Sequence, residues 1–260
     1  MADIKINEKL VVSQTGTAEP VLASNVDLSN VNLSSTTIPA AGVTGTLGSG
    51  VTLPDQIGEW KPLGQIKLTT ATDKVYFVNG LAPQGNDGTT YTSVASTVVW
   101  DTTYPLYKLN WFINGSTATN TFPKIRICTS AHGSNAKDST FATSGYRTMT
   151  WQRAWYNSAW LDETGTYTDC IWRPLNGAKI DMVHIAELTF SGIKSSAYPV
   201  CFGREAGSAY TSSSSHFFGG DCHGRFETTG TYYGIQIMEV DNTGSFQTGS
   251  VFSLSGLYTG

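Results

Sequence analysis

The chain has 260 residues and a formal net charge of −4, and only 14% of its residues are charged, against roughly 25% in an average soluble domain. Ser, Thr, Gly and Asn replace the missing charges, as is common in β-rich proteins that work outside cells or in virions. The acidic balance lacks the basic footprint of nucleic-acid-binding proteins. No apolar run approaches the ~20 residues of a membrane span. We therefore expect neither nucleic acid nor membrane insertion.

The N-terminal stretch, residues 1–16, has no long apolar core followed by a small-residue cleavage site. This absence predicts a protein made and assembled in a cytoplasm rather than secreted. Without a secretory signal, a disulfide framework is not expected. The four cysteines are widely spaced, form no CxxC motif and are expected to be buried, reduced thiols: Cys128, Cys170, Cys201 and Cys222.

A short cluster of potential metal ligands begins at His216 and continues with Asp221, Cys222 and His223. Its spacing fits no common zinc pattern. If Cys222 and His223 lie on a strand, their side chains point to opposite faces. We therefore predict no metal site and no cofactor.

The first part of the chain, residues 1–60, has no aromatic residue before Trp60 and cannot build a core of its own. It carries a five-residue near-repeat, NVDLS then NVNLS, followed by a run rich in Gly, Thr and Val. A thin apolar edge of this kind becomes ordered only by pairing with a partner. We predict an extended anchoring arm whose apolar residues mediate assembly: Val26, Leu28, Val31, Leu33, Val43, Leu47 and Val51.

Residues 61–260 read as one domain made of many short strands separated by turn residues. This pattern predicts an all-β fold, an antiparallel β-sandwich of jelly-roll-like type. A single helical turn is possible over 158–163, and Gly219-Gly220 predicts a turn. The expected strands are 65–70, 74–79, 106–114, 123–130, 146–153, 167–173, 182–191, 199–204, 216–219, 224–228 and two strands after 231. The expected long loops are 81–92, 131–145 and 206–215.

We find no sequence motif of a catalytic site: HExxH, GxSxG, a P-loop and GxGxxG are all absent. Cleavage of a glycoside would need two carboxyl groups roughly 5 to 10 Å apart. Glu187 lies in an apolar strand and is the carboxylate most easily imagined as partly buried. The alternative, which we favour, is that Glu187 pairs with Arg173 or Arg204 or faces solvent. We expect that the protein is not an enzyme.

An aromatic cluster is the best candidate for binding. The segment 149–161 contains Trp151, Trp155, Tyr156 and Trp160, with Asn, Gln and Arg nearby. Such rings can stack on sugars while the polar groups bond hydroxyls. The alternative, which we favour, is that two rings fill the core and a third seals a subunit interface. A second candidate surface contains Tyr210 and His216, for which an ordinary loop is the simpler account.

Several short motifs resemble a family of β-sandwich structural proteins of tailed bacteriophages, including marine and cyanobacterial phages. They are the strand YPLYKL (104–109), the strand KIRI (124–127) running into a polar loop, and the C-terminal FQTGSVFSL (246–254). The final LYTG departs from the family pattern by an inserted Ser-Gly and a Thr before the last Gly. The resemblance implies a virion component, a fibre, spike or head decoration, which is often trimeric.

Together these features predict a bacteriophage virion structural protein, localised to the virion after assembly in the host cytoplasm. Residues 1–60 would dock to other virion proteins by edge pairing. Residues 61–260 would form a projecting knob, as a homotrimer, in a head decoration or a short fibre. Two alternatives stay open: a tail-fibre module that recognises host surface polysaccharide, and a depolymerase that acts through residues such as Glu187.

Overall fold

The structure is a computed structural model that describes residues 58–86, 97–116, 122–131, 133–156, 159–174, 183–194, 197–211, 214–240 and 244–259, and the short strands β1 (Ile4–Ile6), β2 (Lys9–Ser13) and β3 (Val21–Leu22). For these three short strands, and for 154–156, 159–161, 163, 209–211 and 214–217, only the backbone is described. The chain divides into two compact units, Met1–Leu53 and Pro54–Gly260. The predicted assembly residues from Val26 to Val51 lie outside the described residues.

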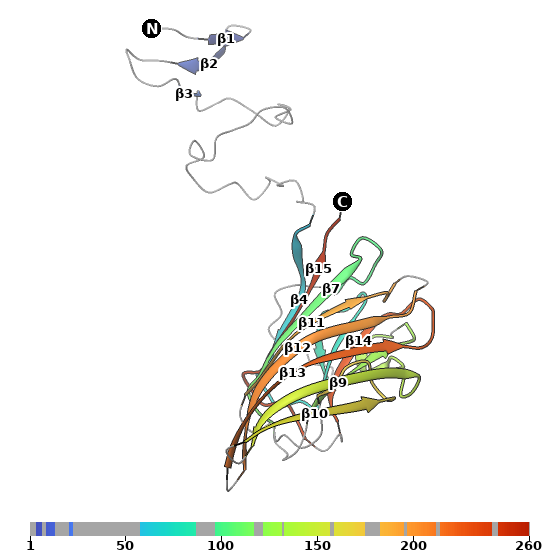
Figure 1. Cartoon of the computed structure of the whole chain (residues 1–260). Helices are drawn as coiled ribbons and strands as arrows, with labels where there is room; N and C mark the ends of the chain where they lie inside the picture. The colour runs from blue at the N-terminus through green and yellow to red at the C-terminus, as the bar shows by residue number, and fades with distance from the viewer. Residues whose placement is uncertain are drawn as a thin grey trace. The chain divides into compact units, whose positions relative to one another are not determined.

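The second unit consists of two antiparallel sheets (Figure 1). The larger sheet has eight strands, in spatial order β10 (Ala159–Tyr167), β9 (Tyr146–Tyr156), β13 (Ser214–Phe226), β12 (Val200–Thr211), β11 (Val183–Ser191), β7 (Leu106–Ile113), β15 (Val251–Leu257) and β4 (Trp60–Lys67). The smaller sheet has four strands, β6 (Gln84–Gly85), β5 (Lys74–Val78), β14 (Gly234–Glu239) and β8 (Pro123–Cys128). The predicted all-β fold, an antiparallel β-sandwich, is confirmed.

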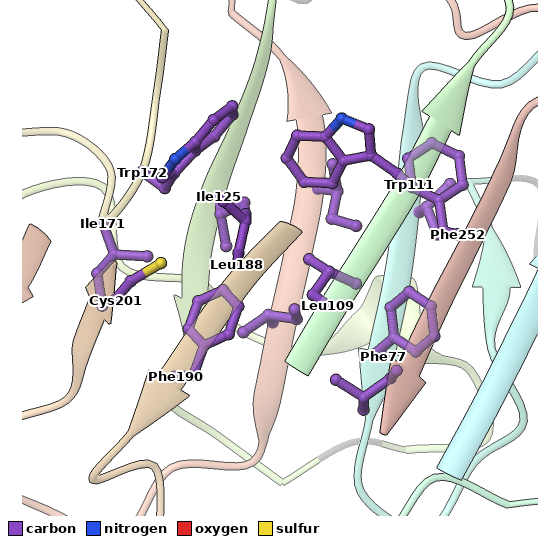
Figure 2. Close-up of a cluster of buried hydrophobic side chains, with 14 of the residues drawn as sticks. Phe77, Leu109, Trp111, Ile125, Ile171, Trp172, Leu188, Phe190, Cys201 and Phe252 are labelled. Carbon is purple, nitrogen blue, oxygen red and sulfur yellow. The ribbon is translucent and has the colours of Figure 1, made fainter. Parts of the chain in front are cut away.

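The core lies between the sheets, because alternate residues of the central strands of the larger sheet are buried. In β7, β11 and β15 the burial alternates strictly, as expected of strands with one face on a core and one in water. Figure 2 shows Trp111, Leu188 and Phe252 among the buried side chains that meet there. Burying a side chain of this size contributes about 1.5–3 kcal/mol. This apolar layer stabilises the sandwich and fixes which residues face outward.

The segment after β10 fills the interior beneath β9 and β13 without forming a strand of the larger sheet. Its backbone bonds to the edge of the smaller sheet, where Ile125 pairs with Trp172. Thr148 and Thr150, on the buried face of β9, donate their hydroxyls to backbone carbonyls of this segment. The prediction of a strand at 167–173 is therefore wrong, because these residues pack across the sheet instead of extending it.

The outer side of the smaller sheet is covered by residues 129–131 and 133–142. They contain one turn of 3-10 helix, Ala136–Asp138, whose Ala136 backbone amide donates to the Gln84 side chain at 2.8 Å. Phe141 packs against the Tyr76 ring, with centroids 5.5 Å apart. Because this segment shields the sheet, every residue of β14 is buried on both faces.

Three local predictions are wrong in the same region of the larger sheet. Residues 159–163 belong to strand β10, not to a helical turn. Gly219-Gly220, expected to be a turn, lies within the 13-residue strand β13. A Cβ at Gly220 would lie 2.3 Å from the Trp151 carbonyl oxygen, so glycine there allows β13 and β9 to approach closely. The predicted loop 206–215 is mostly the end of β12 and the start of β13.

A buried polar chain joins three strands of the larger sheet on its inner face. The Trp111 indole N–H donates to His184 Nδ1 at 2.9 Å, and His184 Nε2 lies 2.8 Å from Glu205 Oε2. An indole nitrogen only donates, so Nδ1 accepts, and the proton of the His184–Glu205 bond lies between Nε2 and the carboxyl. These hydrogen bonds connect β7, β11 and β12 and help to hold the three strands in register.

No helix in the described ranges is long and apolar enough to cross a membrane.

Candidate functional site

The outer face of the larger sheet carries the side chains that point away from the smaller sheet. On β9, β13, β12 and β11 these are the residues that alternate with the buried positions. The four strands lie side by side in that order (Figure 1). Neighbouring strands are about 4.8 Å apart and same-face residues on one strand about 6.7 Å apart. Sequence-distant side chains therefore form regular rows on this face.

A hollow of about 570 Å³ lies on the outer face over β11, β12 and β13. Its lining combines an exposed aromatic ring with charged and hydroxyl groups: Glu187, Thr189, Phe202, Gly203, Arg204, Asp221 and His223. The volume falls within the range of small-molecule sites.

An apolar row crosses the outer face beside and within the hollow. It consists of Met149, His223 and Phe202, which lie directly opposite one another on β9, β13 and β12. Met149 is 56% exposed and Phe202 is 52% exposed. The two apolar side chains therefore flank the His223 imidazole in the strand register, and together they leave apolar surface open to water.

A polar row runs parallel to the apolar row, one same-face position away. It consists of Trp151, Asp221, Arg204 and Glu187, again opposite one another in the strand register. Trp151 is 43% exposed. Arg204 Nε lies 3.2 Å from Asp221 Oδ1. The polar row therefore presents an indole ring at one end, followed by charged groups held by an ion pair.

Glu187 lies at the other end of the polar row. Its environment distinguishes a catalytic acid of a glycosidase from a carboxylate that only accepts hydrogen bonds. Its side chain is 63% exposed and lies 3.4 Å from the Lys108 ammonium group. The idea that Glu187 is partly buried is wrong, and facing solvent is the alternative that the structure supports. A glycosidase acid needs a carboxyl held in surroundings that keep it protonated. An open, ion-paired carboxylate is instead suited to accepting hydrogen bonds from hydroxyls.

Only one of the residues proposed for binding from the sequence has its side chain described. Trp151 lies on the outer face, so it is not one of the rings that fill the core. The side chains of Trp155, Tyr156, Trp160, Tyr210 and His216 are outside the described part of the chain. Their backbones lie on β9, β10, β12 and β13, and the register places Trp155 opposite both Trp160 and Phe217. The topology thus brings the two candidate segments onto neighbouring strands.

The sequence does not predict Phe202 or Met149 as binding residues, and it singles out His223 only as a potential metal ligand. Phe202 stands next to Cys201 in an apolar stretch, and that stretch resembles a wholly buried strand. The useful signal is the alternation of Cys201, Gly203 and Glu205 with Phe202 and Arg204, which places Phe202 and Arg204 on one face. Cys201 is buried, whereas Phe202 is exposed.

Metal chemistry finds no support among the side chains that the structure describes, where no three His, Cys, Asp or Glu residues gather as a metal site. The four cysteines are free and buried, as predicted. Burial raises the pKa of the Cys222 thiol to about 12, so it remains protonated near neutral pH. Comparison of the chain with family models, curated proteins and solved structures finds no match.

Proposed function

We propose that the sandwich is a carbohydrate-binding module that holds a polysaccharide chain against the outer face of its larger sheet. The observation that carries this proposal is the pairing of an exposed apolar row with a parallel row of charged groups around one hollow. Sugars present the matching chemistry, because their C–H faces pack on rings and their hydroxyl edges form hydrogen bonds.

Each row has a separate role in this proposal. Phe202 and Met149 offer the flat apolar contact, and Trp151 adds an indole ring at the end of the polar row. Arg204 donates and Glu187 accepts hydrogen bonds from hydroxyls at the edge of the sugar. Because the strands form a rigid sheet, little backbone entropy is lost on binding.

Affinity electrophoresis tests the proposal directly. The full chain is run through native gels that contain dextran, polygalacturonate or polysaccharide from bacterial envelopes. Retardation by at least one polymer is expected, and Phe202→Ala should reduce it. Migration unchanged by every polymer, or equal retardation of the Phe202→Ala variant, would contradict carbohydrate binding on this face.

For the setting of this module, we propose a bacteriophage virion. The support is the resemblance of three C-terminal and central motifs to phage β-sandwich structural proteins. In this setting the sandwich is a displayed knob, as a homotrimer, and the N-terminal unit docks to other virion proteins. Threefold repetition would multiply weak sugar contacts into durable attachment.

Light scattering tests the assembly part of the proposal separately from sugar binding. The full chain is compared with a chain that begins at Pro54, where the second compact unit starts. The truncation leaves the hydrogen bonds from the Gly58 amide to the Tyr258 carbonyl and from the Tyr258 amide to Glu59 intact. A trimer in both samples places the threefold contact within the sandwich. Monomers in both would contradict self-trimerisation.

A further inference from the structure

Two arginines face each other beside the apolar row. Arg147 on β9 and Arg225 on β13 are direct partners in the strand register, one same-face position beyond Met149 and His223. Their side chains are 76% and 46% exposed. Like charges directly opposite each other on neighbouring strands destabilise a sheet unless an anion lies between them.

One carboxylate serves both guanidinium groups. Glu227 Oε2 lies 3.0 Å from Arg147 Nε, and Glu227 Oε1 accepts a hydrogen bond from Arg225 Nε at 2.6 Å. Among these three side chains, one positive charge remains uncompensated, although the whole chain has a net charge of −4. The local sign is therefore opposite to the sign of the protein.

An exposed ring borders the same two arginines. Tyr198 is 46% exposed, and the Arg225 guanidinium carbon lies 5.1 Å from the centroid of its ring. A guanidinium group held against an aromatic ring keeps its planar fork oriented for a carboxylate. We define Arg147, Arg225, Glu227 and Tyr198 as the arginine corner.

We propose that the arginine corner binds the carboxylate of an acidic sugar, so that the polymer held on the outer face is a uronic-acid-containing or similarly carboxylated polysaccharide. This inference rests on the proposed carbohydrate-binding function. A sugar ring on Met149 and His223 lies about 6.7 Å along the strands from the two arginines, a separation that an exposed arginine side chain can span. Its carboxylate then completes the charge balance that Glu227 alone leaves open.

The test compares polygalacturonate with the same polymer in highly methyl-esterified form, since esterification removes the charge and keeps the sugar. Titration of the full chain should give at least tenfold weaker binding of the ester, because esterification removes the charge-assisted hydrogen bonds to the guanidinium groups. Arg147→Gln should weaken binding of polygalacturonate by about tenfold and leave binding of the ester unchanged.

Arg153→Gln is the matched control. Arg153 lies on the same strand and face, beyond Trp151, and pairs with Asp162 at 3.4 Å. Its substitution removes the same charge outside the arginine corner and should leave the affinity for polygalacturonate within twofold. Equal losses in both variants, or binding of dextran sulfate as tight as that of polygalacturonate, would reduce the result to unspecific polyanion adsorption and overturn the inference.

The remaining outcomes distinguish failure of the arginine corner from failure of the proposed carbohydrate binding. Equal binding of polygalacturonate and its ester would overturn the role of the arginine corner and leave carbohydrate binding standing. Binding of dextran without any binding of polygalacturonate would likewise overturn the role of the arginine corner and leave carbohydrate binding standing. Failure of the full chain to bind any of these polymers or bacterial envelope polysaccharide would overturn both.

Discussion

Trp111 donates its indole N–H to His184 Nδ1 at 2.9 Å, across two strands of the larger sheet. The other ring nitrogen of His184 meets the Glu205 carboxyl, so three polar side chains share one buried chain of hydrogen bonds. Both His184 and Glu205 are almost wholly buried. These three hydrogen-bonded side chains lie on the inner face of the larger sheet, and the outer face of the same sheet is the candidate binding face.

The buried carboxyl predicts a specific pH dependence of stability. Burial raises the pKa of Glu205 above its ordinary value of 4.5, against the lowering effect of its bond to His184. A pKa raised by folding gives a contribution that is complete below the ordinary pKa and is lost as pH rises through the folded-state pKa. Glutamine does not titrate, so Glu205→Gln should not lose stability at this position as pH rises.

The free energy of unfolding of Glu205→Gln, relative to the unsubstituted chain, should therefore increase as pH rises from 4 towards 8. Urea denaturation at five pH values measures it. Glu187→Gln, which alters an exposed carboxylate on a neighbouring strand, is the matched control. A difference between Glu205→Gln and the unsubstituted chain that is the same at every pH would refute this account of the pair.

Gly224 is predicted to be required for packing of the segment after β10. A Cβ at this position would lie 1.7 Å from the Ile171 carbonyl oxygen, which belongs to backbone that cannot easily move. Gly224→Ala should lower the free energy of unfolding by about 1–3 kcal/mol or more. Gly133→Ala, with no atom within 4 Å of the added carbon, should change it by less than about 0.5 kcal/mol. Equal stability of the two variants in denaturant would contradict the interior position of that segment.

The thiols should be inert in the folded protein. All four cysteines are buried and free, and burial raises the pKa of each thiol. Since the thiolate is the reactive form, a thiol-specific chromogenic reagent at pH 8 should react only as the chain unfolds. Release of four equivalents of chromophore at once, in buffer without denaturant, would show that the thiols are accessible and would contradict this prediction.

The sequence was sufficient to predict the strands whose burial alternates without interruption. Leu106–Ile113 and Val183–Ser191 fall within two residues of their predicted limits, because apolar and polar residues alternate there and each strand has one face in water. The sequence does not predict the C-terminal part of β12 or the first residues of β13. Ser and Gly residues dominate them, and their hydrogen bonds come from neighbouring strands that local propensity does not reveal.

The candidate face shows a second limit of sequence reasoning. Trp151 was identified because it lies in an aromatic cluster, but Phe202 and His223 are separated along the chain and become adjacent only through pairing of β12 with β13. Such rows depend on strand order and register. Neither can be derived from one sequence when the connecting segments resemble loops.

The central claim is that the rings in the two rows of the outer face, Trp151 and Phe202, bind polysaccharide. Calorimetric titration with the polymer that retards the full chain most strongly should show Trp151→Ala binding about tenfold more weakly, since stacking on one ring contributes on the order of 1 kcal/mol or more. Phe112→Ala is the matched control, because Phe112 is 42% exposed on the same sheet, close to the 43% of Trp151, but lies on β7 opposite Ile185, outside both rows. Unchanged affinity in Phe112→Ala with a loss in Trp151→Ala is the predicted result. The same affinity in both variants and the unsubstituted chain would contradict the claim.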